Sequence, residues 1–147
     1  MFGIKAFLVL AFGALCALGG AGLAYLYANK QRYALAPSVT SMRAEIGLEK
    51  AHTCSSLSPP IRVQGVPPDT ARIAVEVTDL NLAYSHGGGV VVPPPGGVIS
   101  EGSLSEYMGP CPGVEEHAYR FRLNALSATN KIIGIAEVVK ECCGQVK

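Results

Sequence analysis

Proline and glycine interrupt this sequence so often that long helices are excluded from most of it. Most of the ten prolines and many of the seventeen glycines lie in five short segments: SLSPPI (56–61), GVPPD (65–69), HGGG (86–89), PPPGG (93–97) and GPCPG (109–113). Proline lacks a backbone donor and glycine favours turns, so these segments predict loops between short elements. The fold class that they favour is mainly β, a sandwich or barrel-like domain with long Pro/Gly loops.

The stretches between these loops carry the patterns of strands. Residues 72–78 alternate, with Ile73, Val75 and Val77 on one face, and residues 119–123 alternate aromatic or aliphatic side chains with two arginines. Alternation of this kind predicts half-buried strands. Residues 90–92 form a short apolar run that predicts a strand. Residues 132–139 are apolar throughout, which fits either a buried strand or a short helix.

One segment near the N-terminus differs from the rest. Ala6 to Tyr27 contains 22 residues without a charge. As a helix it would extend roughly 33 Å, enough to cross a hydrocarbon core of about 30 Å. We expect a transmembrane anchor over residues 1–29, a linker over 30–37 and a β domain over 38–147. The alternative for the first segment is a cleaved signal peptide, although its apolar run is longer than such peptides usually have.

A membrane anchor of this kind predicts a single-pass protein of the cell membrane with its β domain outside the cytoplasm. Four cysteines of the predicted domain, Cys54, Cys111, Cys142 and Cys143, favour the same location because disulfides persist there. They allow up to two disulfides in three connectivities. Adjacent strand residues point to opposite faces, so we expect Cys142 and Cys143 to have separate partners. No C-x-x-C pair is present, and a metal site is not expected.

Charge and motifs exclude several function classes. Twelve Lys/Arg nearly balance eleven Asp/Glu, whereas a nucleic-acid-binding domain would need a basic patch. The sequence contains no G-x-S-x-G, H-E-x-x-H or phosphate-binding P-loop motif. Because no activated nucleophile is visible, we expect a protein that is not an enzyme and has no cofactor.

Four polar residues could meet in one cleft. Asp79 ends the alternating strand, His86 precedes three glycines, and His117 and Tyr119 follow the GPCP loop. Imidazoles and a phenol can donate to an anion, and the backbone N–H groups of Gly87–Gly89 could do the same in a turn. Each feature also has a purely structural interpretation: Asp79 as a turn cap, the glycines as a turn and His117 as a packed side chain.

The order of these segments resembles that of the phosphatidylethanolamine-binding protein family, in its bacterial Raf-kinase-inhibitor-like branch. SPPIRVQGVPPDTARIAVEVTD (58–79) is similar to the family's Ser-Pro-Pro segment and the strand ending in Asp, and GPCPGVEEHAYRFRLNAL (109–126) is similar to its Gly-Pro-Cys-Pro and His-x-Tyr-x-Phe segment. The resemblance covers residues 38 to 143. The sequence departs from it at Asn81, where the family has a second carboxylate, and at Gly87, where the family has tryptophan.

This resemblance implies a β-sandwich with a small pocket for an anion such as phosphate or a phospholipid head group. The implied ligand-binding residues are Asp79, His86, Pro110, His117 and Tyr119. The predicted function is therefore a membrane-tethered, non-catalytic binding module. The alternative is a protein-interaction or inhibitor module, because the family includes kinase and protease inhibitors.

Overall fold

The computed structural model describes residues 33–111, 113 and 115–143, nearly all of which belong to one compact unit, Leu35–Lys147. The strands within these residues are β1 (Ala34–Ser41), β2 (Arg43–Ile46), β3 (Ile61–Gln64), β4 (Arg72–Asp79), β5 (Tyr84–Val91), β6 (Val98–Ile99), β7 (His117–Leu126) and β8 (Lys131–Cys142). Two 3-10 turns, η1 (Lys50–His52) and η2 (Pro95–Gly97), lie in the loops.

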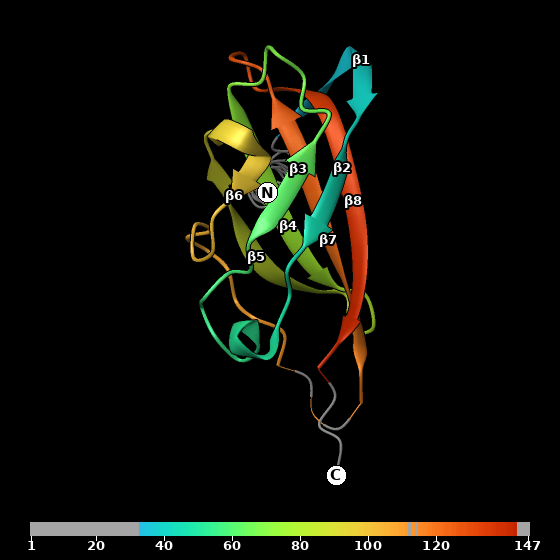
Figure 1. Ribbon diagram of the computed structural model, residues 1–147. Coiled ribbons are helices and arrows are strands. Elements are labelled where there is room, and N and C mark those ends of the chain that lie inside the picture. The colour runs from blue at the N-terminus through green and yellow to red at the C-terminus, as the bar shows by residue number, and fades with distance from the viewer. Residues whose placement is uncertain (1–32, 112, 114, 144–147) are drawn as a thin grey trace, which may run out of the picture. The chain divides into compact units, whose positions relative to one another are not determined.

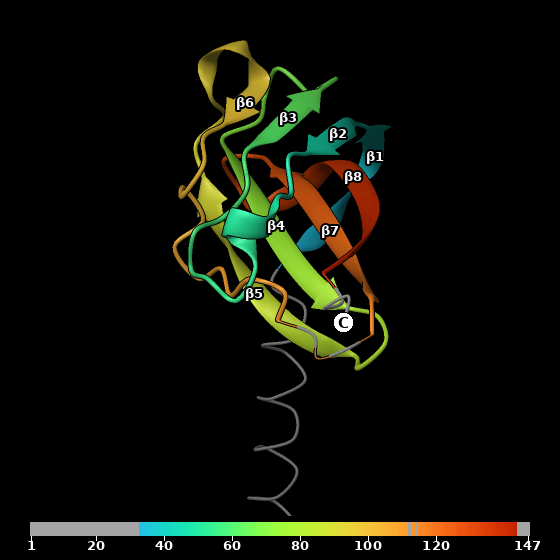
Figure 2. The same ribbon diagram turned by 60° about the horizontal axis from the view of Figure 1, so that its bottom comes forward.

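The strands form two sheets. The larger has the order β1-β8-β7-β4-β5, and the smaller has the order β2-β3-β6. Figure 1 and Figure 2 show the smaller sheet lying against one face of the larger, with β2 next to β8. Where β1 ends and β2 begins, the backbone N–H of Met42 donates to the Ile135 carbonyl of β8 at 2.8 Å. The chain therefore passes from one sheet to the other at this point.

The core lies between the two sheets. In the larger sheet β4 and β7 pair antiparallel, and Val75 lies opposite Leu123 while Val77 lies opposite Phe121. Ile61 of β3 packs into the same cluster, and all five side chains are buried. The period-2 alternation of β4 and β7 thus places one face of each strand in the core. The same register places Asp79 opposite Tyr119 at the end of this apolar row.

A bulge in β5 decides which face His86 occupies. Glu76 of β4 pairs with Gly88, but Thr78 pairs with Ser85, so β5 has one more residue than β4 between these pairs. One extra residue reverses the alternation of a strand, since side chains alternate with a period of two. His86 and Gly88 are two residues apart, so without the bulge they would lie on the same face. Because Gly88 pairs with Glu76, that face would be the outer one. With the bulge, His86 lies on the core face, and only 8% of its surface is exposed.

The prediction of a mainly β protein is confirmed. Residues 132–139, for which a helix was an alternative, lie in strand β8. Of residues 90–92, the first two end the longer strand β5, and Val92 lies just beyond it. The expected turn at Gly87–Gly89 is wrong, because these glycines lie within β5. β1 begins inside the segment 30–37 that was expected to be a linker.

The predicted anchor, Ala6 to Tyr27, lies outside the described residues. Among the residues that the structure does describe, none of the helices has the length and apolar character needed to span a bilayer.

Candidate functional site

Asp79 is the buried anchor of the site. It is the last residue of β4 and is 1% exposed. Its Oδ1 accepts hydrogen bonds from the backbone N–H groups of Asn81 at 2.8 Å and Leu82 at 3.1 Å. Its Oδ2 lies 2.7 Å from Nδ1 of His117. Asp79 therefore closes the turn after β4, as the structural interpretation expects, and also holds a histidine.

The pKa of Asp79 reflects two opposing effects. Burial raises the pKa, but the hydrogen bonds from His117 and from the backbone N–H groups of Leu82 and Asn81 lower it by more. The net pKa lies below the ordinary value for aspartate, because these donors stabilise the carboxylate. An ionised carboxylate only accepts hydrogen bonds, so Nδ1 of His117 carries the proton between them.

The turn after β4 fixes the start of β7. The side-chain oxygen of Asn81 accepts the backbone N–H of Ala118 at 2.9 Å, and the N–H of Leu80 donates to the Ala118 carbonyl at 2.8 Å. Asn81 thus makes a backbone contact beside His117. This contact holds His117 next to Asp79 although 38 residues separate them in sequence.

His86 is oriented by the segment that precedes the GPCP loop. Its Nδ1 lies 2.8 Å from the Met108 carbonyl, and the N–H of Met108 donates to the His86 carbonyl at 2.9 Å. A carbonyl can only accept, so Nδ1 of His86 also carries a proton. Gly88 exchanges two further backbone hydrogen bonds with Glu106. A Cβ at Gly87 would collide with the Glu106 carbonyl. Because glycine has no Cβ, the segment can approach β5 this closely.

These contacts correct the expected role of the glycines. The N–H of Gly88 donates to the Glu106 carbonyl at 3.3 Å, and that of Gly87 donates to the Ser85 hydroxyl at 3.3 Å. Backbone donors that are already paired do not form an anion-binding nest. The glycine run serves instead to let the segment containing Met108 lie along β5.

Tyr119 lies between the two histidines. Its ring packs edge-on against His86, with a centroid distance of 5.3 Å, and stacks near His117 at 6.2 Å. Burial, together with the nearby negative charge of Asp79, raises the pKa of Tyr119 to about 12. The phenol therefore keeps its proton at any physiological pH and remains a possible donor.

These side chains line one pocket of about 390 Å³. Its full lining is Asp79, Leu82, Tyr84, His86, Met108, Gly109, Cys111, His117 and Tyr119. We call it the histidine pocket. Leu82, Tyr84 and Met108 are 68%, 53% and 48% exposed, so apolar side chains lie at the mouth, and the polar groups of Asp79, His86, His117 and Tyr119 lie in a largely apolar setting. The structure brings four of the five predicted site residues together here. The fifth, Pro110, is buried but is not part of the lining, and its carbonyl accepts the N–H of Cys54 at 2.8 Å.

One disulfide includes a residue of the pocket lining, and another lies at the end of strand β8. Cys54 pairs with Cys111, which joins the η1 loop to the pocket lining. Cys142 pairs with Cys143, so the expectation of separate partners is wrong. The alternation rule does not apply to this pair, because β8 ends at Cys142 and Cys143 has a φ of 86° outside the strand. Cys142 lies directly opposite His117 in the sheet.

His52 is a buried residue whose role the sequence did not suggest. It is 2% exposed, its Nδ1 accepts the N–H of Glu49 at 2.9 Å, and its Nε2 lies 2.7 Å from Glu101. Its carbonyl accepts the Tyr107 hydroxyl at 3.3 Å. His52 therefore joins η1 to the loops that lead toward the histidine pocket. In the sequence, only the nearby Cys54 could have indicated a role for His52. His52 lies outside the lining of the histidine pocket.

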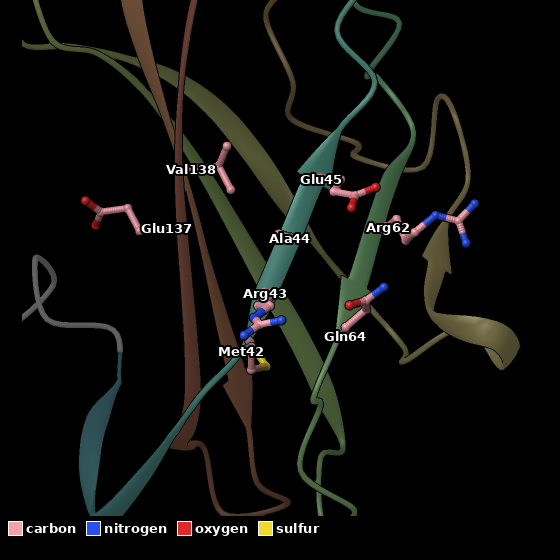
Figure 3. A pocket seen from close by; sticks show the side chains of 8 residues that line it. All are labelled: Met42, Arg43, Ala44, Glu45, Arg62, Gln64, Glu137 and Val138. Carbon is pink, nitrogen blue, oxygen red and sulfur yellow. The ribbon is translucent and has the colours of Figure 1, made fainter.

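Another hollow, of about 360 Å³, lies where β2, β3 and β8 meet. Figure 3 shows its charged side chains, and those of Arg62 and Glu137 point away from each other. Its lining contains no histidine or buried acid. Converging polar groups in an apolar setting distinguish a binding site, so the histidine pocket is the stronger candidate. Within the described residues, no group of three or more His, Cys, Asp and Glu side chains is placed to hold a metal ion.

The chain matches none of the protein-family models with which it was compared, and a comparison with curated proteins gives no match.

Proposed function

We propose that this chain is a non-catalytic binding module whose histidine pocket takes the phosphate group of a small molecule or of a phospholipid head group. The observation that carries the proposal is the meeting of His86, His117 and Tyr119 in one pocket, on strands β5 and β7. Each of these side chains can donate a hydrogen bond to an anionic oxygen. A volume of about 390 Å³ is large enough for a phosphate ester.

The apolar mouth supports a ligand with an apolar part beyond its phosphate. Leu82, Tyr84 and Met108 expose about half or more of their surface at the pocket. A free phosphate ion would leave these side chains in water, whereas a lipid or other ester would cover them. We propose that Ala6 to Tyr27 tethers the module to a membrane, because the length and apolar character of that segment suit a membrane span.

We also propose that the chain is a divergent member of the phosphatidylethanolamine-binding protein family. The support is the order of the sequence segments, together with the placement of Asp79, His86, His117 and Tyr119 in one pocket. Asn81 and Gly87 depart from the family pattern, but both make backbone contacts that build this pocket.

The test is a titration of the full chain in non-ionic detergent, followed through the histidine ring signals by NMR. Inorganic phosphate, phosphoethanolamine and short-chain phosphatidylethanolamine are added separately. We expect saturable shifts of His86 and His117 together. The third histidine, His52, is an internal control because it lies outside the pocket lining. Tighter binding of the lipid than of phosphoethanolamine would identify a lipid ligand, and equal affinity would identify the phosphate group alone as the determinant. If none of the three probes moves either pocket histidine, the proposal is wrong.

A protein-interaction module is the second candidate function. The exposed side chains of Leu82, Tyr84 and Met108 favour it, because apolar residues grouped at one place on a surface often mark a protein contact. Replacing Leu82 and Met108 by serine would weaken such a contact. Binding of inorganic phosphate, which would leave these side chains in water, would change little. Titration of the variant with inorganic phosphate therefore separates the two functions.

A further inference from the structure

Among the residues that the structure describes, the hydrogen bonds of the two pocket histidines engage one nitrogen of each ring and leave the other without a partner. Nδ1 of His117 donates to the Asp79 carboxylate, and Nδ1 of His86 donates to the Met108 carbonyl. A neutral imidazole carries only one N–H, so Nε2 of each ring is then a bare acceptor. Nε2 becomes a donor only when the ring is protonated.

These proton positions do not suit the binding of an anion while both imidazole rings are neutral. Two bare Nε2 atoms would point lone pairs at the anionic oxygens of a ligand, and only the Tyr119 hydroxyl would donate. Two protonated rings would instead offer two N–H groups and two positive charges. We propose that the histidine pocket binds a phosphate group together with two protons, one for the Nε2 position of each histidine. This inference rests on the proposed function.

An ionised carboxylate lies beside His117. Asp79 on β4 remains ionised because its hydrogen bonds keep its pKa low, and its Oδ2 lies 2.7 Å from Nδ1 of His117. Tyr119, on the same strand as His117, stays neutral because its pKa is raised to about 12. On β8, Cys142 lies opposite His117 and carries no charge in its disulfide. Glu116, which precedes His117 in the chain, is exposed.

The groups around His86 are nearly all neutral. Tyr84 on β5 and Tyr119 on β7 pack edge-on against its ring, at 5.2 Å and 5.3 Å between centroids. Glu106 belongs to the segment that pairs with β5, and its side chain is exposed. On β8, Lys140 lies opposite Tyr119 in the sheet. His86 therefore lacks a carboxylate partner like that of His117, and the anionic ligand itself would supply the compensating charge.

Proton uptake has a measurable consequence. Phosphate esters lose their second proton near about pH 6. Where the free ligand and both rings of the free protein are unprotonated, two protons must come from solvent for each phosphate group that binds. Affinity should then fall by up to about 100-fold for each further pH unit, since each linked proton contributes a factor of ten. Sulfate carries no proton in this range and should show the same dependence.

The experiment is calorimetric titration of the full chain with phosphoethanolamine and with sulfate, at pH 5.5 to 8. Each titration is repeated in two buffers of different ionisation enthalpy, so that the heat reports the number of protons taken up. We expect uptake of about two protons per ligand at pH 8. Binding that consumes no protons and is independent of pH would overturn the inference and leave the proposed function standing. Absence of binding at every pH would overturn both.

Two variants separate proton uptake from a general change in the pocket. In Asp79→Asn, the amide oxygen can keep the backbone bonds of Asn81 and Leu82 while the amide NH₂ faces His117. That ring must then accept at Nδ1, which moves its proton to Nε2, so uptake should fall from two to one. His86→Gln replaces an acceptor by a neutral donor and should also reduce uptake to one. The matched control is Asp69→Asn, an exposed aspartate outside the pocket lining, which should retain two. Uptake of two protons by both pocket variants would contradict the assignment to the Nε2 atoms.

Discussion

The Asp79→Asn substitution tests the physical account of the site through stability alone, without a ligand. The variant keeps the shape of the side chain and an oxygen for the backbone donors of Asn81 and Leu82. It removes the charge that strengthens the hydrogen bond from His117, whose donor and acceptor atoms are 2.7 Å apart. A hydrogen bond to a charged group contributes about 1.5–3 kcal/mol and one between neutral groups about 0.5–1.5 kcal/mol, so we expect a loss of about 1 kcal/mol in the free energy of unfolding at pH 7.

The assay is urea unfolding of the full chain in detergent, followed by tyrosine fluorescence. With an m-value of about 1.5 kcal/mol/M for a domain of this size, a loss of about 1 kcal/mol lowers the midpoint by about 0.7 M. Asp69→Asn is the matched control, because it makes the same chemical change at an exposed position. Surface substitutions of this kind usually change stability by less than about 0.5 kcal/mol.

The pH dependence has a definite sign. The pKa of Asp79 is lower in the folded protein than in the unfolded chain, so its contribution to stability is fully present above the unfolded value of about 3.9. This contribution is lost as the pH falls through the lower, folded pKa. Stability of the native protein should therefore decrease on acidification, and the decrease should be smaller in Asp79→Asn. Equal midpoints and equal acid slopes for the two asparagine variants would refute the reasoning.

Other predictions concern the wall of the pocket. Replacing Cys54 and Cys111 together by alanine should cost about 4 kcal/mol, because their disulfide closes a loop with a sequence separation of 57. The same double change at Cys142 and Cys143, adjacent in sequence, should cost much less, and thermal unfolding of both variants provides the comparison. Gly88→Ala should cost about 2–5 kcal/mol, since φ is +144° there and a Cβ would collide with a carbonyl of β4. An alanine variant with native stability and unchanged histidine signals would contradict that account of β5.

Sequence alone predicted the β class and the principal strands, because alternation and Pro/Gly punctuation are local properties. The alternation in residues 72–78 and 119–123 predicts half-buried strands without knowledge of the strands with which they pair. The grouping of Asp79, His117 and Tyr119 could also be predicted, because Asp79 ends one predicted strand and the other two residues lie at the start of another. The position of these residues at strand ends and beside loops predicted the grouping, and the family resemblance implies the same residues.

Only the tertiary structure decided how these residues act. The bulge that turns His86 to the core face depends on the pairing of β5 with β4, and alternation within one strand contains no signal for it. The glycines beside it are strand residues because a segment from the Met108 loop pairs with their backbone. The proton positions on both histidines follow from partners 22 and 38 residues away in sequence. Pairing across sheets is a non-local property, so the sequence supplied the chemical groups of the pocket and the fold determined which of their atoms remain free.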